Sequence, residues 1–240
     1  TRTAEFIKYA NNIVLASQIS LSNELSLLAS RLSNVDFTKV IEGVQSDYRW
    51  TPKYKNKLIK PQILSYQIPG CGYGGSCLPK DVESISALGI KNGVDMEMTN
   101  AITKVNSKQP YQVANLIEET YGTIKSKKVL LLGLSFKPET DDIRESASIK
   151  IIESIYNLGT QITVHDPIAL ENFKKKFGNI FPKITSTLKW KNCISKNDII
   201  IVATNWNEYR ELLKLDTSKK LVFDCRRLFK SEEIKCSQYL

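Results

Sequence analysis

The sequence predicts an α/β protein, with a mainly helical part over residues 1–121 followed by a doubly wound parallel sheet over residues 122–240. Three observations lead to this fold class. Residues 4–33 contain neither proline nor glycine and carry leucines at helical spacing. The runs 128–134 and 198–204 are apolar in their middle, as strands covered on both faces are. Helical patterns separate such runs, which is the alternation that builds a parallel sheet.

The first helix is predicted over residues 4–33. One of its faces carries Leu21, Leu25, Leu28 and Leu32. A helix of that length spans about 45 Å, more than a compact domain needs. We therefore expect it to join two domains or to pack against a second copy of itself. Lys8 and Asn12 are four residues apart, so they project from one side of its first turns. A Lys/Asn pair of this kind more often consists of polar residues on the protein surface.

Further helices are expected in the rest of the helical part. Asp36 is a suitable N-cap for a helix over residues 35–44. Residues 45–69 have no regular pattern, and Pro79 suits the first turn of a helix that runs to about residue 88. Two more helices are predicted over residues 94–106 and 110–121.

The second part alternates strands and helices. Strands are predicted at 128–134, 161–165, 198–204 and 220–224, and helices at 147–158 (capped by Ser146), 169–177, 185–193 and 206–214. Ligands of such sheets bind at the carboxyl ends of the strands. Two cations suited to phosphate, Lys137 and Arg226, follow strand ends. Asp166 follows another, and either accepts a ribose hydroxyl or caps the turn at Pro167.

A glycine-rich run over residues 69–81 precedes the predicted helix at Pro79. Four glycines allow close approach of another molecule, and Cys77 then lies near a helix N-terminus, which favours the thiolate. Lys80 adds a cation and Asp81 a carboxylate. This is an arrangement that covalent catalysis needs; the alternative is that Cys77 is a buried structural thiol.

The same run contains glycines at positions 70, 72 and 75, which match the dinucleotide pattern G-x-G-x-x-G. That pattern has meaning only between a buried strand and a helix. The residues before it, 60–69, include two prolines and no strand-like run. We do not interpret the match as a cofactor loop.

The net charge of +9 favours an anionic partner. Nucleic acid is the general suggestion, but the lysines are spread along the chain, and the one dense block, 174–176, fits a solvated helix face. A small phosphorylated ligand explains part of the charge equally well, so nucleic acid is not expected.

Cysteine and hydropathy patterns bear on compartment and metal binding. Five scattered cysteines, no C-x-x-C pair and a single histidine, His165, argue against a zinc site. We expect free thiols in a reducing cytoplasm, no membrane span and no signal peptide, because residues 1–3 lead directly into an amphipathic pattern.

Four motifs in this order resemble the UDP-glucose/GDP-mannose dehydrogenase family, and within it the UDP-glucose 6-dehydrogenases. They are AEFIKYANN at 4–12, GGSCLPKD at 74–81, GLSFKPETDDIRES at 133–146 and FDCR at 223–226, the last with Cys225 where the family has glycine. The match spans nearly the whole chain. It implies a long central helix that forms a homodimer, a UDP-sugar-binding α/β domain and a role in polysaccharide biosynthesis.

The resemblance also implies a mechanism. Such enzymes oxidise the sugar C6 alcohol twice, to a carboxylate, and reduce two NAD. The residue at Cys77 attacks the aldehyde, and the resulting thioester is hydrolysed. The residue at Lys8 stabilises oxyanion charge, and those at Asn12 and Asp81 position or activate water. Further residues implied are Lys8, Asn12, Tyr73, Gly74, Phe136, Lys137 and Arg226 for the UDP-sugar, and Arg144 and Lys80 for NAD.

Two departures from the family pattern matter. The family begins with an NAD-binding domain, so we expect this chain to be a central and C-terminal fragment that does not turn over sugar alone. The loop 47–69 is longer than usual and lacks Arg-Ile-Gly, which leaves substrate identity open. Ser76 favours UDP-glucose over N-acetylated sugars, and GDP-mannose is a further alternative. A non-catalytic nucleotide-sugar-binding module and a basic nucleic-acid binder are the competing classes.

Overall fold

The computed structural model describes residues 1–239 of the chain, with the side chain of residue 239 left out. The chain divides into two compact units. The first comprises Thr1–Gly72 and Cys77–Ser107, and the second comprises Tyr73–Ser76 and the chain from Lys108 onward. The domain boundary expected after residue 121 stays a prediction.

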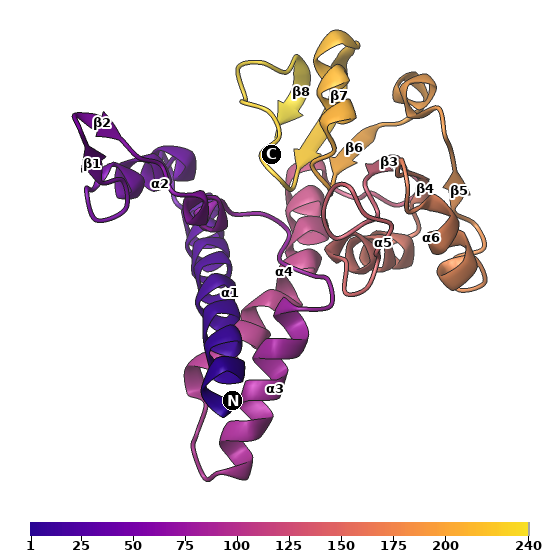
Figure 1. The fold of residues 1–240 in the computed structure, drawn as a ribbon. Coiled ribbons are helices and arrows are strands. Elements are labelled where there is room, and N and C mark those ends of the chain that lie inside the picture. The colour runs from indigo at the N-terminus through magenta and orange to yellow at the C-terminus, as the bar shows by residue number, and fades with distance from the viewer. Residues whose placement is uncertain (240) are drawn as a thin grey trace. The chain divides into compact units, whose positions relative to one another are not determined.

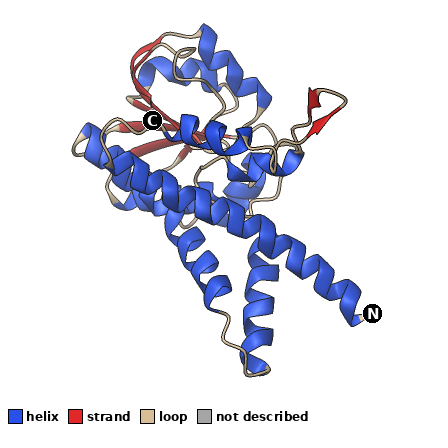
Figure 2. Cartoon of the chain, turned by 90° about the vertical axis from the view of Figure 1, so that its left-hand side faces the viewer, coloured by secondary structure: helices blue, strands red, loops and turns tan. Residues whose placement is uncertain are grey.

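The first unit is helical apart from one short hairpin (Figures 1 and 2). Its helices are α1 (Arg2–Arg31), α2 (Phe37–Ser46), α3 (Leu78–Lys91) and the first half of α4 (Glu97–Tyr121). Asp36 caps α2 as predicted, because its Oδ1 accepts hydrogen bonds from the N–H groups of Thr38 (2.9 Å) and Lys39 (3.4 Å). Helix α1 packs against α3 and against the 3₁₀ segment η1 (Gln62–Gln67).

The stretch predicted to be irregular contains a hairpin. Strands β1 (Lys53–Tyr54) and β2 (Lys57–Leu58) pair antiparallel. The two residues between them, Lys55 and Asn56, have φ angles of 45° and 59°. Two successive positive φ values belong to the tight turn that suits the twist of a hairpin. Lysine is an uncommon residue at such a position, so the turn escaped the sequence pattern.

Helix α4 is continuous, and the prediction of two helices separated before Pro110 is wrong. Proline lacks the N–H group that would donate to residue 106 and crowds that carbonyl, so it usually ends a helix. Here Pro110 is buried and lies inside the helix, where neighbouring residues such as Val113 and Ala114 are also buried. Tertiary packing has overridden a local signal. The two units meet along the sequence within this helix, between Ser107 and Lys108.

The second unit is built on a six-stranded sheet in the order β5-β4-β3-β6-β7-β8, and all neighbouring strands are parallel (Figure 1). Its strands are β3 (Lys128–Leu132), β4 (Gln161–His165), β5 (Thr185–Ser186), β6 (Ile199–Val202), β7 (Thr217–Asp224) and β8 (Cys236–Tyr239). Helices α5 (Ala147–Asn157) and α6 (Leu170–Phe177) make crossovers. The predicted α/β fold is confirmed.

Three details of this unit differ from the sequence prediction. The helix expected over residues 185–193 is wrong: the chain forms edge strand β5 and then the 3₁₀ segment η2 (Trp190–Lys196). The helix expected over 206–214 is also 3₁₀, η3 (Asn207–Lys214). Strand β8 was not predicted. These are short elements whose backbone is decided by packing on the sheet rather than by their own periodicity.

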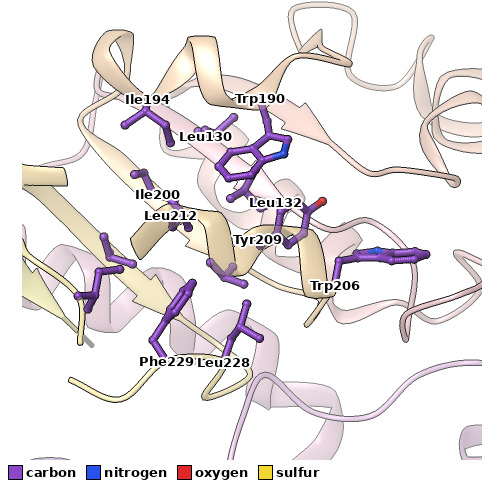
Figure 3. Packing of buried hydrophobic residues seen from close by; sticks show 13 residues of the cluster. Leu130, Leu132, Trp190, Ile194, Ile200, Trp206, Tyr209, Leu212, Leu228 and Phe229 are labelled. Atoms are coloured by element: carbon purple, nitrogen blue, oxygen red, sulfur yellow. The ribbon is translucent and has the colours of Figure 1, made fainter. Parts of the chain in front are cut away.

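One hydrophobic cluster of the second unit lies on the face of the sheet where η2 and η3 pack (Figure 3). Trp190 and Tyr209 meet edge to face, with ring centroids 5.5 Å apart. Leu130 and Ile200 lie beneath them on adjacent strands and are fully buried. Within residues 1–239 no helix is long and apolar enough to cross a membrane.

Candidate active site

Cys77 lies at the N-cap of α3, directly after the glycine run, and its side chain is exposed. The alternative of a buried structural thiol is therefore wrong. Pro79 occupies the second position of the helix, where its missing N–H costs no hydrogen bond. The Asp81 N–H donates to the Cys77 carbonyl at 2.9 Å, which closes the first helical turn and fixes the cysteine relative to the aspartate.

Asp81 is fully buried and connects α3 to α1. Its Oδ2 atom accepts a hydrogen bond from Asn12 Nδ2 at 2.6 Å and lies 3.1 Å from Lys8 Nζ. Both partners come from the same side of α1, as their spacing predicted. Its second oxygen, Oδ1, is buried and has no hydrogen-bond partner among the described residues. The carboxyl group is thus enclosed, and one of its two oxygens is left without a hydrogen-bond partner among the described residues.

Lys8 responds to this carboxylate. The hydrogen bond and the charge of Asp81 raise the pKa of the Lys8 ammonium above its ordinary value. Cys77 contributes in the same direction, with a smaller effect than Asp81. The thiol therefore lies within electrostatic range of Lys8. The side chain of Lys8 is 58% exposed, so the ammonium can still meet a ligand.

The glycine run is held by the second unit's own residues. The Gly75 N–H donates to the Arg144 carbonyl at 2.9 Å. A Cβ atom on Gly74 would lie 2.1 Å from the Glu145 carbonyl oxygen, and one on Gly75 would lie 2.7 Å from the Phe136 ring. Gly75 also has a φ angle of +83°. Glycine is required at both positions, because the loop lies directly against the 136–146 segment.

Arg144 is oriented by a neighbouring carboxylate. Its guanidinium binds Asp142 through Nε (3.0 Å) and a terminal nitrogen (2.8 Å), and this contact lowers the pKa of Asp142. The side chain remains 63% exposed. A fixed, exposed guanidinium of this kind can bind an anionic group that approaches the segment.

Strand order reverses between β3 and β6, and the crevice of a parallel sheet lies at that switch point. Thr204, after β6, donates its hydroxyl hydrogen to the Ser135 carbonyl at 2.6 Å. Arg226 follows β7 and donates from Nε to the Ala203 carbonyl at 2.8 Å. These contacts bring the loops after β3, β6 and β7 together. No sequence pattern pointed to Thr204, because its contact is with a residue 69 positions away.

Phe136, Lys137 and Tyr73 belong to the same unit. Lys137 is exposed, with its ammonium 5.5 Å from the centroid of the Phe136 ring. Tyr73 is buried, at 8% exposure. The predicted substrate residues therefore fall into two groups, one in each unit: Lys8 and Asn12 with Asp81 and Cys77, and Tyr73, Gly74, Phe136, Lys137 and Arg226 with Arg144.

Asp166 is buried at the end of β4, and its carboxylate is saturated. It accepts six hydrogen bonds at 2.8–3.2 Å, from the N–H groups of Leu134, Ser135, Ile168 and Ala169, the Ser135 hydroxyl and the Trp206 indole. Of the two alternatives for this residue, the structure favours the cap of the turn at Pro167 over the ribose acceptor.

These contacts also distinguish the loop after β3 from a dinucleotide-binding loop. A dinucleotide-binding loop presents its N–H groups to the pyrophosphate, but those of Leu134 and Ser135 are used by Asp166. These two N–H groups are therefore not directed at a pyrophosphate. The Gly70–Gly75 pattern follows η1 rather than a strand, so it is not a cofactor loop, as predicted. No three His, Cys, Asp or Glu side chains of residues 1–238 are grouped to hold a metal ion.

Lys137 and Arg226 lie in the loops after β3 and β7 of this parallel sheet, and sheets of this kind bind nucleotides at the carboxyl ends of their strands. Comparison with known families makes this specific. Residues 2–108 match the central domain of the UDP-glucose/GDP-mannose dehydrogenase family, and residues 130–231 match its UDP-binding domain. The chain belongs to this family.

Individual relatives agree with this assignment. UDP-glucose 6-dehydrogenase AglM of Haloferax volcanii is 35% identical over 232 residues, covering 96% of this chain and 50% of the relative. TuaD of Bacillus subtilis is 30% identical, covering 99% and 49%. The solved UDP-glucose dehydrogenase of Pyrobaculum islandicum superposes with a TM-score of 0.82 at 35% identity, covering 99% of this chain and 50% of that one. The chain spans about half the length of the relatives it matches.

Proposed function

We propose that the chain provides the catalytic-thiol and nucleotide-sugar-binding parts of an NAD-dependent UDP-glucose 6-dehydrogenase. The observation that carries the proposal is the cluster at the start of α3. There, one buried carboxylate contacts Lys8 and Asn12, and the exposed Cys77 lies one helical turn away. The matches to UDP-glucose dehydrogenases over nearly the whole chain support it.

The second unit binds the nucleotide in this proposal. The cations of the second unit, Lys137 and Arg226, bind the diphosphate, since ammonium and guanidinium groups are the usual phosphate partners. Tyr73, Gly74 and Phe136 complete the nucleotide contacts. In the proposed reaction, C6 of the sugar lies at the Cys77 sulfur.

The reaction removes two hydrides from C6. The alcohol first loses a hydride and a proton and becomes an aldehyde. The Cys77 sulfur then adds to the carbonyl carbon, giving a thiohemiacetal whose oxygen is stabilised by the Lys8 ammonium. Loss of a second hydride leaves a thioester. Water attacks this carbon, the C–S bond breaks, and the products are the carboxylate and the regenerated thiol.

Asp81 and Asn12 serve the proton steps. The Asp81 Oδ2 atom holds Lys8 and Asn12 in place, while its buried, unused Oδ1 atom can accept a hydrogen from the attacking water. Each of the two hydrides would pass to a separate NAD molecule. The chain offers NAD the side chains of Arg144 and Lys80. Because the N–H groups of Leu134 and Ser135 are used by Asp166 and not by a pyrophosphate, we propose that the 240 residues alone do not reduce NAD.

Calorimetric titration of the chain with UDP-glucose, UDP, UDP-N-acetylglucosamine and GDP-mannose tests the nucleotide-sugar part of the proposal. We expect UDP-glucose to bind most tightly, and Lys137→Ala or Arg226→Ala to weaken it by about tenfold, the effect of losing roughly 1.4 kcal/mol from one charged contact. Tighter binding of UDP-N-acetylglucosamine or GDP-mannose would change the proposed substrate but would still support a nucleotide-sugar dehydrogenase. Absence of saturable binding to all four would contradict the proposal.

We propose a homodimer formed through α1. The leucines predicted to share a face are exposed, with Leu21 at 58% and Leu28 at 57%. Leu21 and Leu25 line an apolar groove of about 430 Å³ with residues of α2 and α4, such as Val44 and Ile102. Exposed apolar surface of this extent marks an interaction site, and a second copy of the same helix would cover it.

A further inference from the structure

A polar cavity of about 390 Å³ lies at the amino ends of the strands in the second unit. Strands β3, β4 and β5 begin there with Lys128, Gln161 and Thr185. Lys196 and Asn197, which precede β6, also line it. Nucleotides bind parallel sheets at the carboxyl ends of the strands. The cavity therefore lies at the opposite ends of the strands from the crevice assigned to the nucleotide sugar.

The register of the sheet explains why these side chains meet. Lys128 is the partner of Gln161, and Thr163 is the partner of Thr185. Side chains two residues apart on a strand share a face, so all four lie on one face of the sheet. The segment η2 covers that face with Trp190 and Ile194 (Figure 3). Its other residues, Cys193 and Lys196, form the outer wall of the cavity.

The cavity is cationic. Lys128, Lys183 and Lys196 line it, and all three are exposed. None of them takes part in an ion pair within the described part of the chain, and no acidic side chain lines the cavity. The neighbouring Asp198 directs Oδ2 to the Lys128 N–H at 3.0 Å. Three ammonium groups around one concave surface repel one another unless an anion is present.

Three hydroxyl groups that make no hydrogen bond among the described residues also line the cavity. The side chains of Thr163, Thr185 and Ser186 make no hydrogen bond among the described residues. By contrast, Thr187 Oγ1 accepts from the Lys189 N–H at 3.0 Å, and Asn197 Nδ2 donates to the Cys193 carbonyl at 2.7 Å. Hydroxyls can both donate and accept, so three groups remain that suit the hydroxyls of a sugar.

We propose that this cavity binds a small phosphorylated sugar. The three lysines bind the phosphate dianion as point charges, and the hydroxyl groups bind the carbohydrate. The volume lies at the small end of the range of ligand pockets, about 300–1,000 Å³, which suits a sugar monophosphate better than a complete nucleotide sugar. The site is independent of the proposed dehydrogenase reaction.

Calorimetric titration with glucose 1-phosphate at low ionic strength, with UDP present at saturation, tests the proposal. We expect one molecule to bind per chain, and Lys183→Ala/Lys196→Ala to weaken binding by about a hundredfold, the effect of losing two charge-assisted contacts of roughly 1.4 kcal/mol each. The control Lys214→Ala/Lys230→Ala removes the same charge from two exposed lysines that line no described cavity of this unit and should bind as the natural chain does.

A second readout locates the ligand. Cys193 lines the cavity, whereas Cys236 is half-buried on β8 and does not. Glucose 1-phosphate should slow iodoacetamide labelling of Cys193, measured by peptide mass spectrometry, and leave Cys236 unchanged. No saturable binding, equal loss in both double variants, or binding without protection of Cys193 would each overturn the proposal.

Discussion

The contact between Asp81 and Lys8 joins two residues that lie 73 positions apart and rests on a buried carboxylate. The Asp81 charge raises the pKa of Lys8, so Asp81→Asn should lower that pKa towards its ordinary value. Titration of the lysine side chains by NMR measures this directly. Asp95→Asn removes an exposed carboxylate of the same unit and should leave Lys8 unchanged. If the pKa of Lys8 were the same in both variants, Asp81 would not be the group that raises it.

His165 makes stability depend on pH. It is 3% exposed, its Nδ1 lies 3.0 Å from the Tyr209 hydroxyl, and burial lowers its pKa from 6.5 to about 4, against the opposing charge of Asp166. Between these values the unfolded chain binds a proton that the folded chain does not. The contribution of neutral His165 to the free energy of unfolding is therefore fully present above about pH 6.5 and is lost as the pH drops towards 4.

Urea unfolding at about pH 7 and pH 4.5 measures the effect. The natural chain should lose about 2 kcal/mol from this residue, and His165→Gln should lose correspondingly less between the two conditions. Equal losses in the two proteins would mean that His165 is not the group responsible.

At the level of single residues, the sequence predicted which side chains share a helix face, but it did not predict which distant residues they contact. Lys8 and Asn12 were correctly placed on one side of a helix because that depends only on helical geometry. Their shared partner Asp81 lies 69 positions from Asn12, and only the family resemblance connected them in advance. The role of Asp166 was left open because its six hydrogen-bond donors come from three different segments, which no local sequence pattern shows.

The glycine run illustrates how one loop depends on the segment beneath it. Gly75→Ala should destabilise the second unit by about 1–3 kcal/mol, because the new methyl group meets the Phe136 ring at 2.7 Å and the φ angle of +83° is strained for alanine. It should also weaken UDP binding, since Phe136 is proposed to contact the nucleotide. Thermal unfolding and calorimetry measure the two effects.

Gly43 provides the matched control. It lies inside α2, and a Cβ atom there would meet nothing within 4 Å. Gly43→Ala should therefore stabilise the chain by about 0.5–1 kcal/mol, the usual gain from replacing a helical glycine. Destabilisation by both changes would indicate that the Gly75 result reflects something other than the Phe136 contact.

At the level of elements, long periodic segments were predictable and short ones were not. The first helix, the caps at Asp36 and Ser146 and strand β4 agree with the prediction. Strand β5 has two residues and η2 seven, too few for a periodicity to decide their conformation. Pro110 gave a strong local signal, but α4 stays continuous through it, and Pro110 packs in the interior near the buried Val113 and Ala114.

At the level of the whole molecule, the proposed homodimer depends on the exposed leucines of α1. Leu25→Asp places a charge in the apolar groove and should shift the chain from dimer to monomer in light scattering after size exclusion. Leu188→Asp is the control, because Leu188 is 74% exposed and belongs to the second unit. A natural chain that is already monomeric, or a dimer unaffected by Leu25→Asp, would refute an interface through this helix.

The proposed function requires the sugar of the bound UDP-glucose to reach the Cys77 sulfur. Iodoacetamide labelling of Cys77, followed by peptide mass spectrometry, tests this requirement, with Cys236 as the internal standard. With UDP-glucose at ten times its dissociation constant, labelling of Cys77 should slow by about tenfold, and UDP alone, which lacks the sugar, should protect it less. Unchanged labelling of Cys77 in a chain that calorimetry shows to be saturated with UDP-glucose would contradict the proposed active site.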